Sequence, residues 1–126
     1  MKRQVYTPNA PKPVGPYSQA VVYRDLIFLS GQIGIDPTTG NLKEGLKEQF
    51  LQCLKNVESI LSEVGSSKEK ILRVVIYLTD LDQFKLVNEV YEEFFRDVEV
   101  KPARTTVGVD RLPLNAFVEV EVTAHL

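Results

Sequence analysis

Residues 71–84 read ILRVVIYLTDLDQF and predict a strand that leads directly into a helix. β-Branched side chains dominate residues 71–79, as is typical of a strand in the middle of a sheet. Side chains alternate along a strand, so we expect two faces. One face has Leu72, Val74, Ile76 and Leu78, and the other has Arg73, Val75, Tyr77 and Thr79. Asp80, followed three residues later by Gln83, indicates a capping box at the start of the helix.

The helix that follows carries an apolar stripe at helical spacing. Its members are Phe84, Val87, Tyr91, Phe94 and Val98. Asn88 falls on the same stripe, where a polar amide is costly unless it is hydrogen-bonded. Asn88 therefore either ties down nearby backbone or faces a functional site, and the pattern leaves both interpretations open.

An earlier helix is predicted from Leu46 to Val64, with Gly65 ending it. Further strands are predicted at residues 3–6, 20–23, 26–30, 103–109 and 117–126. The element order is then β-β-β-α-β-α-β-β, and an α+β fold with two helices on one face of a mixed sheet is the expected architecture. The 126 residues fit a single domain, 1–126.

Alternation along the last two strands predicts an uncovered sheet face that mixes charged and large apolar side chains. In the last strand, residues 118, 120, 122, 124 and 126 are apolar and should lie under the helices. The other face is expected to carry Phe28, Ser30, Tyr77, Arg104, Thr106, Phe117 and Glu119. A free surface does not favour such a mixture, so we expect copies of the chain to bury this face against one another. Any site there would lie between subunits.

Arg104 and Glu119 are the candidate functional pair of this face. They could form a cross-strand ion pair, which contributes little when it is exposed. Alternatively they have separate roles: the planar fork of Arg104 suits a carboxylate, and Glu119 could hold and activate a water molecule. Alternation by itself leaves both interpretations open.

Composition excludes several classes of protein. The net charge is −2 with no basic block, which disfavours a dedicated nucleic-acid surface. One Cys and one His provide no metal-ligand spacing, and the lone Cys53 forms no intrachain disulfide and suits a reducing compartment. Burial beside the first helix is the expected role of Cys53. No apolar signal core or membrane-length run occurs, so we expect a cytoplasmic protein.

Blocks in register along almost the whole chain resemble the Rid family, the reactive intermediate deaminases, and in particular its RidA branch. They include APKPVGPYSQA at residues 10–20, SGQI at 30–33, DPTTG at 36–40, PAR at 102–104 and VEVE at 118–121. Further matching blocks lie at residues 56–57, 77–81, 88–91 and 111–113. The resemblance implies a chorismate-mutase-like fold assembled as a homotrimer, with sites in the clefts between subunits. It also implies hydrolysis of enamine and imine intermediates, such as 2-aminoacrylate, to 2-keto acids and ammonia, with no cofactor.

The resemblance also implies roles for individual residues. Arg104 matches the arginine that grips the substrate carboxylate, and Glu119 matches the glutamate that positions the hydrolytic water. The matching pocket residues are Tyr17, Ser30, Gly31, Ile33 and Asn88. Thr106 stands where some members have cysteine, which bears on substrate preference, but its hydroxyl remains available for binding.

Two other functions remain open at this point. One is a non-catalytic trimeric module that binds small carboxylates or protects other proteins. The other is a ribonuclease that inhibits translation, a role attributed to some members of the family, against which the acidic balance of the chain weighs.

Overall fold

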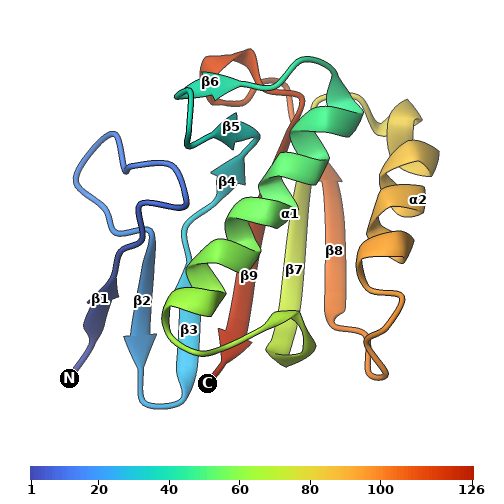
Figure 1. The fold of residues 1–126 in the computed structure, drawn as a ribbon. Coiled ribbons are helices and arrows are strands. Elements are labelled where there is room, and N and C mark those ends of the chain that lie inside the picture. The colour runs from blue at the N-terminus through green and yellow to red at the C-terminus, as the bar shows by residue number, and fades with distance from the viewer.

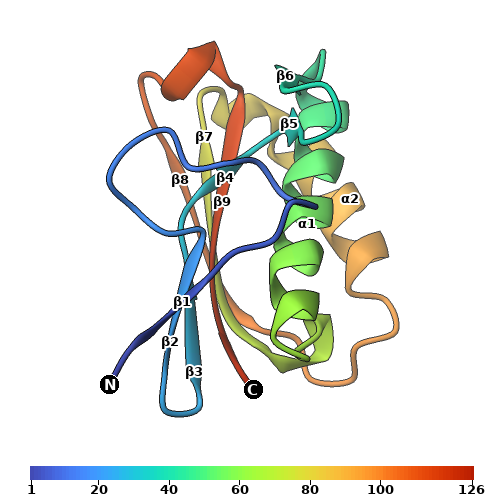
Figure 2. The same ribbon diagram turned by 60° about the vertical axis from the view of Figure 1, so that its left-hand side comes forward.

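The computed structural model describes all residues, 1–126, as one main sheet with both helices on the same face, beside a small two-stranded sheet (Figure 1, Figure 2). The helices are α1 (Leu46–Glu63) and α2 (Phe84–Phe94). The strands are β1 (Arg3–Val5), β2 (Ala20–Tyr23), β3 (Leu26–Leu29), β4 (Gln32–Ile33), β5 (Ile35–Asp36), β6 (Asn41–Leu42), β7 (Ile71–Leu78), β8 (Ala103–Gly108) and β9 (Val118–His125). The predicted α+β class and the placement of both helices on one face are confirmed.

The main sheet has the order β1-β2-β3-β9-β7-β8, and β4 continues alongside β9 where β3 leaves it. All neighbours are antiparallel except β7 and β8, which are parallel. That parallel pair follows from the helical crossover between them, because α2 returns the chain to the same end of the sheet. β8 is an edge strand, and its outer side has no partner within the chain.

The core fills the space between the sheet and the two helices. Phe50, Val57 and Leu61 of α1 and Val87 of α2 are almost fully buried there, as the helical spacing predicts. The alternate residues of β9, from Val118 to Ala124, are also buried, whereas Leu126 is exposed beyond the end of the strand. The opposite sheet face has no covering layer, and side chains such as Phe28 and Tyr23 are exposed on it.

Local predictions were wrong at three places. A β-bulge between Ile71 and Arg73 shifts the register of β7, so Ile71 is buried and Leu72 is exposed. The capping box does not form: Asp80 accepts a hydrogen bond from Asp82 N and caps a short 3₁₀ turn before α2 begins. The chain between β3 and α1 also contains β4, β5 and β6, which are only two residues long each and leave no periodic signal.

The predicted face of β8 was also wrong. β8 pairs in register with β7, so that Arg104 lies beside Val74 and Thr106 lies beside Ile76. Registered neighbours point to the same side of a sheet, and Val74 and Ile76 are completely buried under the helices. Arg104 and Thr106 therefore lie on the helix-covered face, and Thr105 and Val107 lie on the uncovered one.

Gly34 marks the closest approach of the β4–β5 connection to α1. A Cβ atom at Gly34 would lie 2.5 Å from both Cα and the carbonyl oxygen of Gln49, and a helix backbone cannot yield at that point. We expect Gly34→Ala to lower the free energy of unfolding by about 1–3 kcal/mol through overpacking, measured by urea denaturation. Gly31→Ala is the matched control, because its Cβ would meet only the flexible Glu119 side chain. An equal loss of stability in both variants would contradict this explanation.

Candidate functional site

Five of the predicted site residues lie together around one cleft. The cleft has a volume of about 630 Å³ and opens between the proline-rich loop, the β3–β4 connection and β9. The predicted residues that line it are Tyr17, Ser30, Gly31, Ile33 and Glu119. They come from segments as far apart in sequence as residues 17 and 119, so the fold brings them together.

The proline-rich loop is held by a buried side chain that the sequence did not single out. Gln19 is 1% exposed, and its Oε1 accepts a hydrogen bond from Thr7 N at 2.7 Å. Its Nε2 donates to the carbonyl oxygens of Thr7, Ala10 and Pro11 at 3.0–3.3 Å. This one amide replaces the ladder bonds that a proline-rich segment cannot make, and it therefore sets the position of Tyr17.

Ser30 and Tyr17 have defined local partners at the mouth of the cleft. Ser30 Oγ donates to the Ser18 carbonyl oxygen at 2.6 Å, which joins the end of β3 to the loop. The hydroxyl of Tyr17 accepts a weak bond from Val14 N at 3.2 Å, while the side chain is half exposed. Tyr17 can therefore contact a ligand in the cleft with its ring and its hydroxyl group.

Glu119 is the only acidic side chain that lines this cleft. It stands opposite Ile33 of β4 and Tyr77 of β7 on the uncovered face of the sheet. Burial raises the pKa of the Glu119 carboxyl, and the nearby negative charge of Glu121 raises it further. A carboxyl group with a raised pKa can accept and return a proton near neutral pH more readily than an ordinary glutamate.

Gly31 makes room for the Glu119 side chain. A Cβ atom at Gly31 would lie 2.8 Å from Glu119 Cδ and closer still to Oε2. The absence of a side chain at residue 31 therefore permits the observed position of the carboxylate.

The remaining predicted residues form a separate group between α2 and β8. Arg104 Nη1 donates to Asn88 Oδ1 at 2.8 Å, so the Asn88 amide faces this candidate side chain. The guanidinium lies over the Tyr91 ring at 4.7 Å from its centroid and 5.4 Å from that of Phe84. These contacts fix the plane of the guanidinium and leave its other donors available.

Two hydroxyl groups beside this arginine have no partner within the chain. Tyr91 OH and Thr106 Oγ1 are both buried and unbonded. Burial raises the pKa of the Tyr91 hydroxyl although the positive charge of Arg104 opposes the shift, so Tyr91 stays neutral. A carboxylate bound to Arg104 could accept hydrogen bonds from such donors.

Arg104 and Glu119 do not meet within one chain. They lie on opposite faces of the sheet, and β7 separates their strands. The cross-strand ion pair considered from the sequence is therefore wrong, and so is the shared face. A single small ligand cannot contact both side chains of the same chain.

Cys53 is not a candidate nucleophile. It is completely buried, and burial raises the pKa of its thiol far above the ordinary value. No group of three or more His, Cys, Asp and Glu side chains is arranged to hold a metal ion. No helix of the chain combines the length and the apolar character that a membrane crossing requires.

Comparisons with known proteins agree along the whole chain. Residues 7–126 match the family described as Endoribonuclease L-PSP. A RutC family protein of Aquifex aeolicus is 59% identical over 122 residues, covering 97% of this chain and 98% of that protein. The chloroplastic Reactive Intermediate Deaminase A of Arabidopsis thaliana is 43% identical over 126 residues, covering 99% of this chain and 66% of that protein. A Rid family protein of Yersinia pestis has the same fold, with a TM-score of 0.97, 40% identity and complete coverage of both chains.

Proposed function

This chain belongs to the Endoribonuclease L-PSP family, the family of the Rid and RutC proteins, and on that premise we propose that it hydrolyses enamine and imine intermediates to 2-keto acids and ammonia. The substrate class is a small 2-imino acid such as 2-iminopropanoate, the tautomer of 2-aminoacrylate. The observation that carries the proposal is the half-buried Glu119 in a cleft with Tyr17 and Ser30, with an oriented arginine elsewhere on the same chain.

Arg104 is proposed to bind the substrate carboxylate. Its guanidinium is held by Asn88 on one side and by the Tyr91 ring on its face. A guanidinium oriented in advance loses little conformational freedom when it forms two parallel bonds to a carboxylate. The unbonded hydroxyl of Thr106 is suited to bind the same carboxylate.

Glu119 is proposed to act on water. An imine carbon is already electrophilic, so water needs a base and a fixed position more than it needs a covalent nucleophile. With the imine nitrogen protonated, the carboxylate takes one proton from water as the C–O bond forms, and the electron pair of the C=N bond moves onto nitrogen to give a neutral carbinolamine. Glu119 then gives that proton to the amine nitrogen, and the C–N bond breaks as ammonia leaves. The second proton of the water, on the hydroxyl oxygen, passes to the Glu119 carboxylate as the C=O bond of the keto acid forms, and from there to solvent. Every atom of the products comes from the imine and one water molecule.

The complete site is proposed to lie between subunits of a homotrimer. One chain keeps Arg104 and Glu119 on opposite faces of its sheet, so one substrate can reach both only if they come from different chains. The unpaired edge of β8 and the exposed apolar side chains of the uncovered face supply surfaces for such an assembly. A monomer by sedimentation at micromolar concentration would contradict this arrangement.

The proposed activity is tested by generating 2-aminoacrylate with a pyridoxal-phosphate enzyme and following its loss in the presence and absence of this protein. Acceleration of ammonia and pyruvate release is the expected result, and imines from several amino acids would define the preferred side chain. Because the family description names an endoribonuclease, an RNA substrate belongs in the same experiment. RNA cleavage without imine hydrolysis would replace the proposal, and saturable binding of pyruvate without turnover would indicate a binding module.

The pH dependence of the reaction should follow Glu119. Its pKa is raised by burial and then by Glu121, so the carboxylate becomes protonated at a higher pH than an ordinary glutamate as the pH falls. We expect kcat/KM to fall through this pKa on the acidic side and to be lost at all pH values in Glu119→Gln. Glu121→Gln removes a negative charge from the same sheet face, so it should lower the pKa of Glu119 and move the acidic limb to lower pH.

The matched control for this pH experiment is Glu93→Gln. Glu93 is an exposed glutamate on α2 that pairs with Arg96 and does not line the cleft. An acidic limb that stays in place in Glu121→Gln, or that moves equally in Glu93→Gln, would show that Glu119 does not control the profile.

A further inference from the structure

Three amide side chains on α1 form a buried polar row on an otherwise apolar side of the helix. Gln49, Gln52 and Asn56 are 2%, 6% and 0% exposed, and their i, i+3 and i+7 spacing puts them on one stripe. Phe50 and Cys53, at positions i+1 and i+4 counted from Gln49, are buried beside them in the apolar core. A buried amide destabilises a fold unless it is hydrogen-bonded, so the partners of this row indicate its role.

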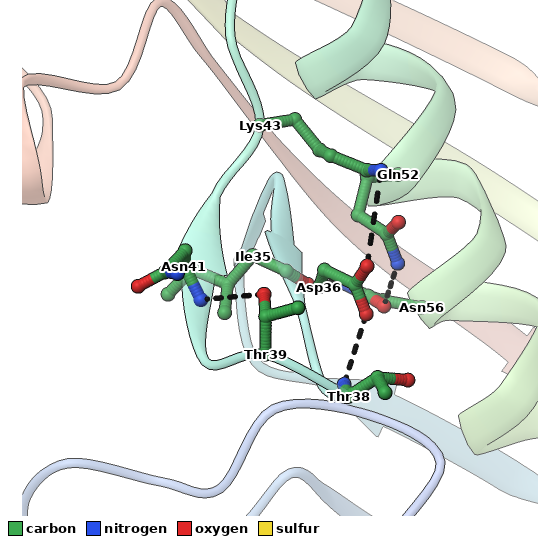
Figure 3. Close-up of polar contacts among 8 residues, drawn as sticks. All are labelled: Ile35, Asp36, Thr38, Thr39, Asn41, Lys43, Gln52 and Asn56. Atoms are coloured by element: carbon green, nitrogen blue, oxygen red, sulfur yellow. Dashed lines mark hydrogen bonds and ion pairs between the residues drawn. The ribbon is translucent and has the colours of Figure 1, made fainter.

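The last two amides of the row hold the backbone on both sides of Gly34. Asn56 Nδ2 donates to the Ile33 carbonyl oxygen at 3.4 Å and to that of Ile35 at 3.0 Å. Gln52 Nε2 donates to Asn56 Oδ1 at 2.8 Å, which fixes the orientation of the Asn56 amide (Figure 3). Asn56 thus reaches from α1 to β4 and β5, and Gln52 holds its amide in that orientation.

The first amide of the row joins two further segments. Gln49 Nε2 donates to the Lys43 carbonyl oxygen at 3.0 Å, immediately after β6. Gln49 Oε1 accepts a bond from Phe117 N at 2.7 Å, immediately before β9. The row as a whole therefore ties α1 to β4 and β5 within the β4–β6 segment, residues 32–42, to Lys43 just after it, and to the start of the strand that carries Glu119.

The β4–β6 segment has little support from the sheet. β4 pairs with β9 through two residues only, and β5 pairs with β6 through two residues in a sheet of their own. The hairpin closes on itself through Asp36, which accepts a bond from Thr38 N and pairs with Lys43 at 3.7 Å (Figure 3). The pairing with β9 holds β4, but the contacts within the β5–β6 hairpin do not join it to the rest of the molecule, whereas the bonds from Asn56 to Ile35 and from Gln49 to Lys43 do.

The same segment forms one wall of the cleft. Ile33 lines the cleft and stands directly opposite Glu119 across the β4–β9 pairing. Gly31, just before β4, lies against the Glu119 carboxylate. A displacement of β4 would therefore change both the space around the carboxylate and its exposure to water.

We propose that the amide row Gln49–Gln52–Asn56 positions the Glu119 wall of the cleft, with Asn56 as its main positioning residue. The proposal rests on the proposed function in one respect, since it takes Glu119 to act on the substrate. None of the three amides lines the cleft, so they act through β4 and the start of β9 rather than by touching the ligand.

The test compares Asn56→Ala with a matched core variant in the intact assembled protein. Ile60 is buried on the same helix and does not line the cleft, so Ile60→Val or Ile60→Ala, whichever matches the Tm of the Asn56 variant, is the control. Hydrogen exchange should become faster in peptides covering residues 31–43 and 117–121 in Asn56→Ala alone. We expect kcat/KM for the imine to fall about tenfold to a hundredfold in that variant, with the acidic limb of its pH profile displaced, and neither change in the control.

A milder variant covers the case in which Asn56→Ala does not fold. Gln52→Leu removes only the bond that orients Asn56, so it should give the same pattern of exchange and activity at a smaller amplitude. Unchanged exchange in residues 31–43, or faster exchange with wild-type kcat/KM and pH profile, overturns the positioning role in either variant.

Failure of the proposed function gives a different result. Wild-type protein that does not accelerate imine hydrolysis would overturn the proposed deaminase activity. Hydrogen exchange in the same variants would still show whether the amide row positions residues 31–43. Weaker binding of pyruvate in Asn56→Ala than in the Ile60 control would then support a positioning role in a binding site, and equal binding would overturn it.

Discussion

Arg104→Ala should abolish most of the imine hydrolysis while leaving the protein folded. The variant loses the charged fork proposed to bind the substrate carboxylate, and truncation of one partner of such a pair commonly costs about 2–5 kcal/mol. We therefore expect kcat/KM to fall about a hundredfold or more. Pyruvate binding, measured by calorimetry, should be lost to a similar degree. Arg104→Lys keeps the charge but not the planar fork, so it should recover only part of both.

Arg96→Ala is the matched control for this experiment. Arg96 is a highly exposed arginine after α2 whose partner is Glu93 of the same surface. Its removal should leave kcat/KM and pyruvate binding unchanged. An Arg104→Ala variant that is folded, trimeric and as active as the wild type would show that the carboxylate is bound elsewhere.

Two inactive variants should restore activity when they assemble together. In the proposed homotrimer, co-expression of Arg104→Ala with Glu119→Gln, each with its own affinity tag, should give mixed trimers. If each cleft takes Arg104 from one chain and Glu119 from the next, a trimer that holds both variants has both native residues in one of its clefts, about a third of them. We expect purified mixed trimers to show about a third of wild-type kcat, starting from parents that are almost inactive.

The control for complementation combines two changes on the same half of the cleft. Asn88 is hydrogen-bonded to Arg104 of the same chain. In trimers that mix Arg104→Ala with Asn88→Ala, the arginine half of every cleft therefore carries one of the two substitutions. That mixture should not exceed the average of its parents. Mixed Arg104→Ala and Glu119→Gln trimers without recovery would overturn the proposal that one substrate contacts Arg104 of one chain and Glu119 of the next.

Local signals in the sequence were sufficient to predict the helices and the longer strands. α1 and the six longer strands lie within one or two residues of their predicted bounds. α2 begins later than Asp80 because a 3₁₀ turn precedes it, and it ends at Phe94, before the predicted stripe residue Val98. Periodic burial produces such signals directly, since each face of a strand or helix repeats its contacts. β4, β5 and β6 have two residues each, which is too short for any period.

The bulge at Leu72 illustrates a second limit. Alternation placed Leu72 with Val74 and Ile76, but one inserted residue in the pairing with β9 turns Leu72 outward and Ile71 inward. The sequence of residues 71–73 does not distinguish a bulge from a regular strand, because Ile71 and Leu72 are both apolar and either side chain could face the core.

The sequence by itself determined the fold class, the order of the main elements, the burial of Cys53 and, through resemblance, the family. It also divided β8 into two sets of alternate residues, with Arg104 and Thr106 in one set. Which set faces the helices depends on the register of β8 against β7, a contact between strands separated by a whole helix. Only the tertiary structure decided that Arg104 lies under α2 beside Asn88 while Glu119 lies on the other face with Tyr17 and Ser30. Alternation determines that neighbouring side chains of a strand point to opposite faces of the sheet. The pairing of distant strands determines which of the two faces each side chain takes.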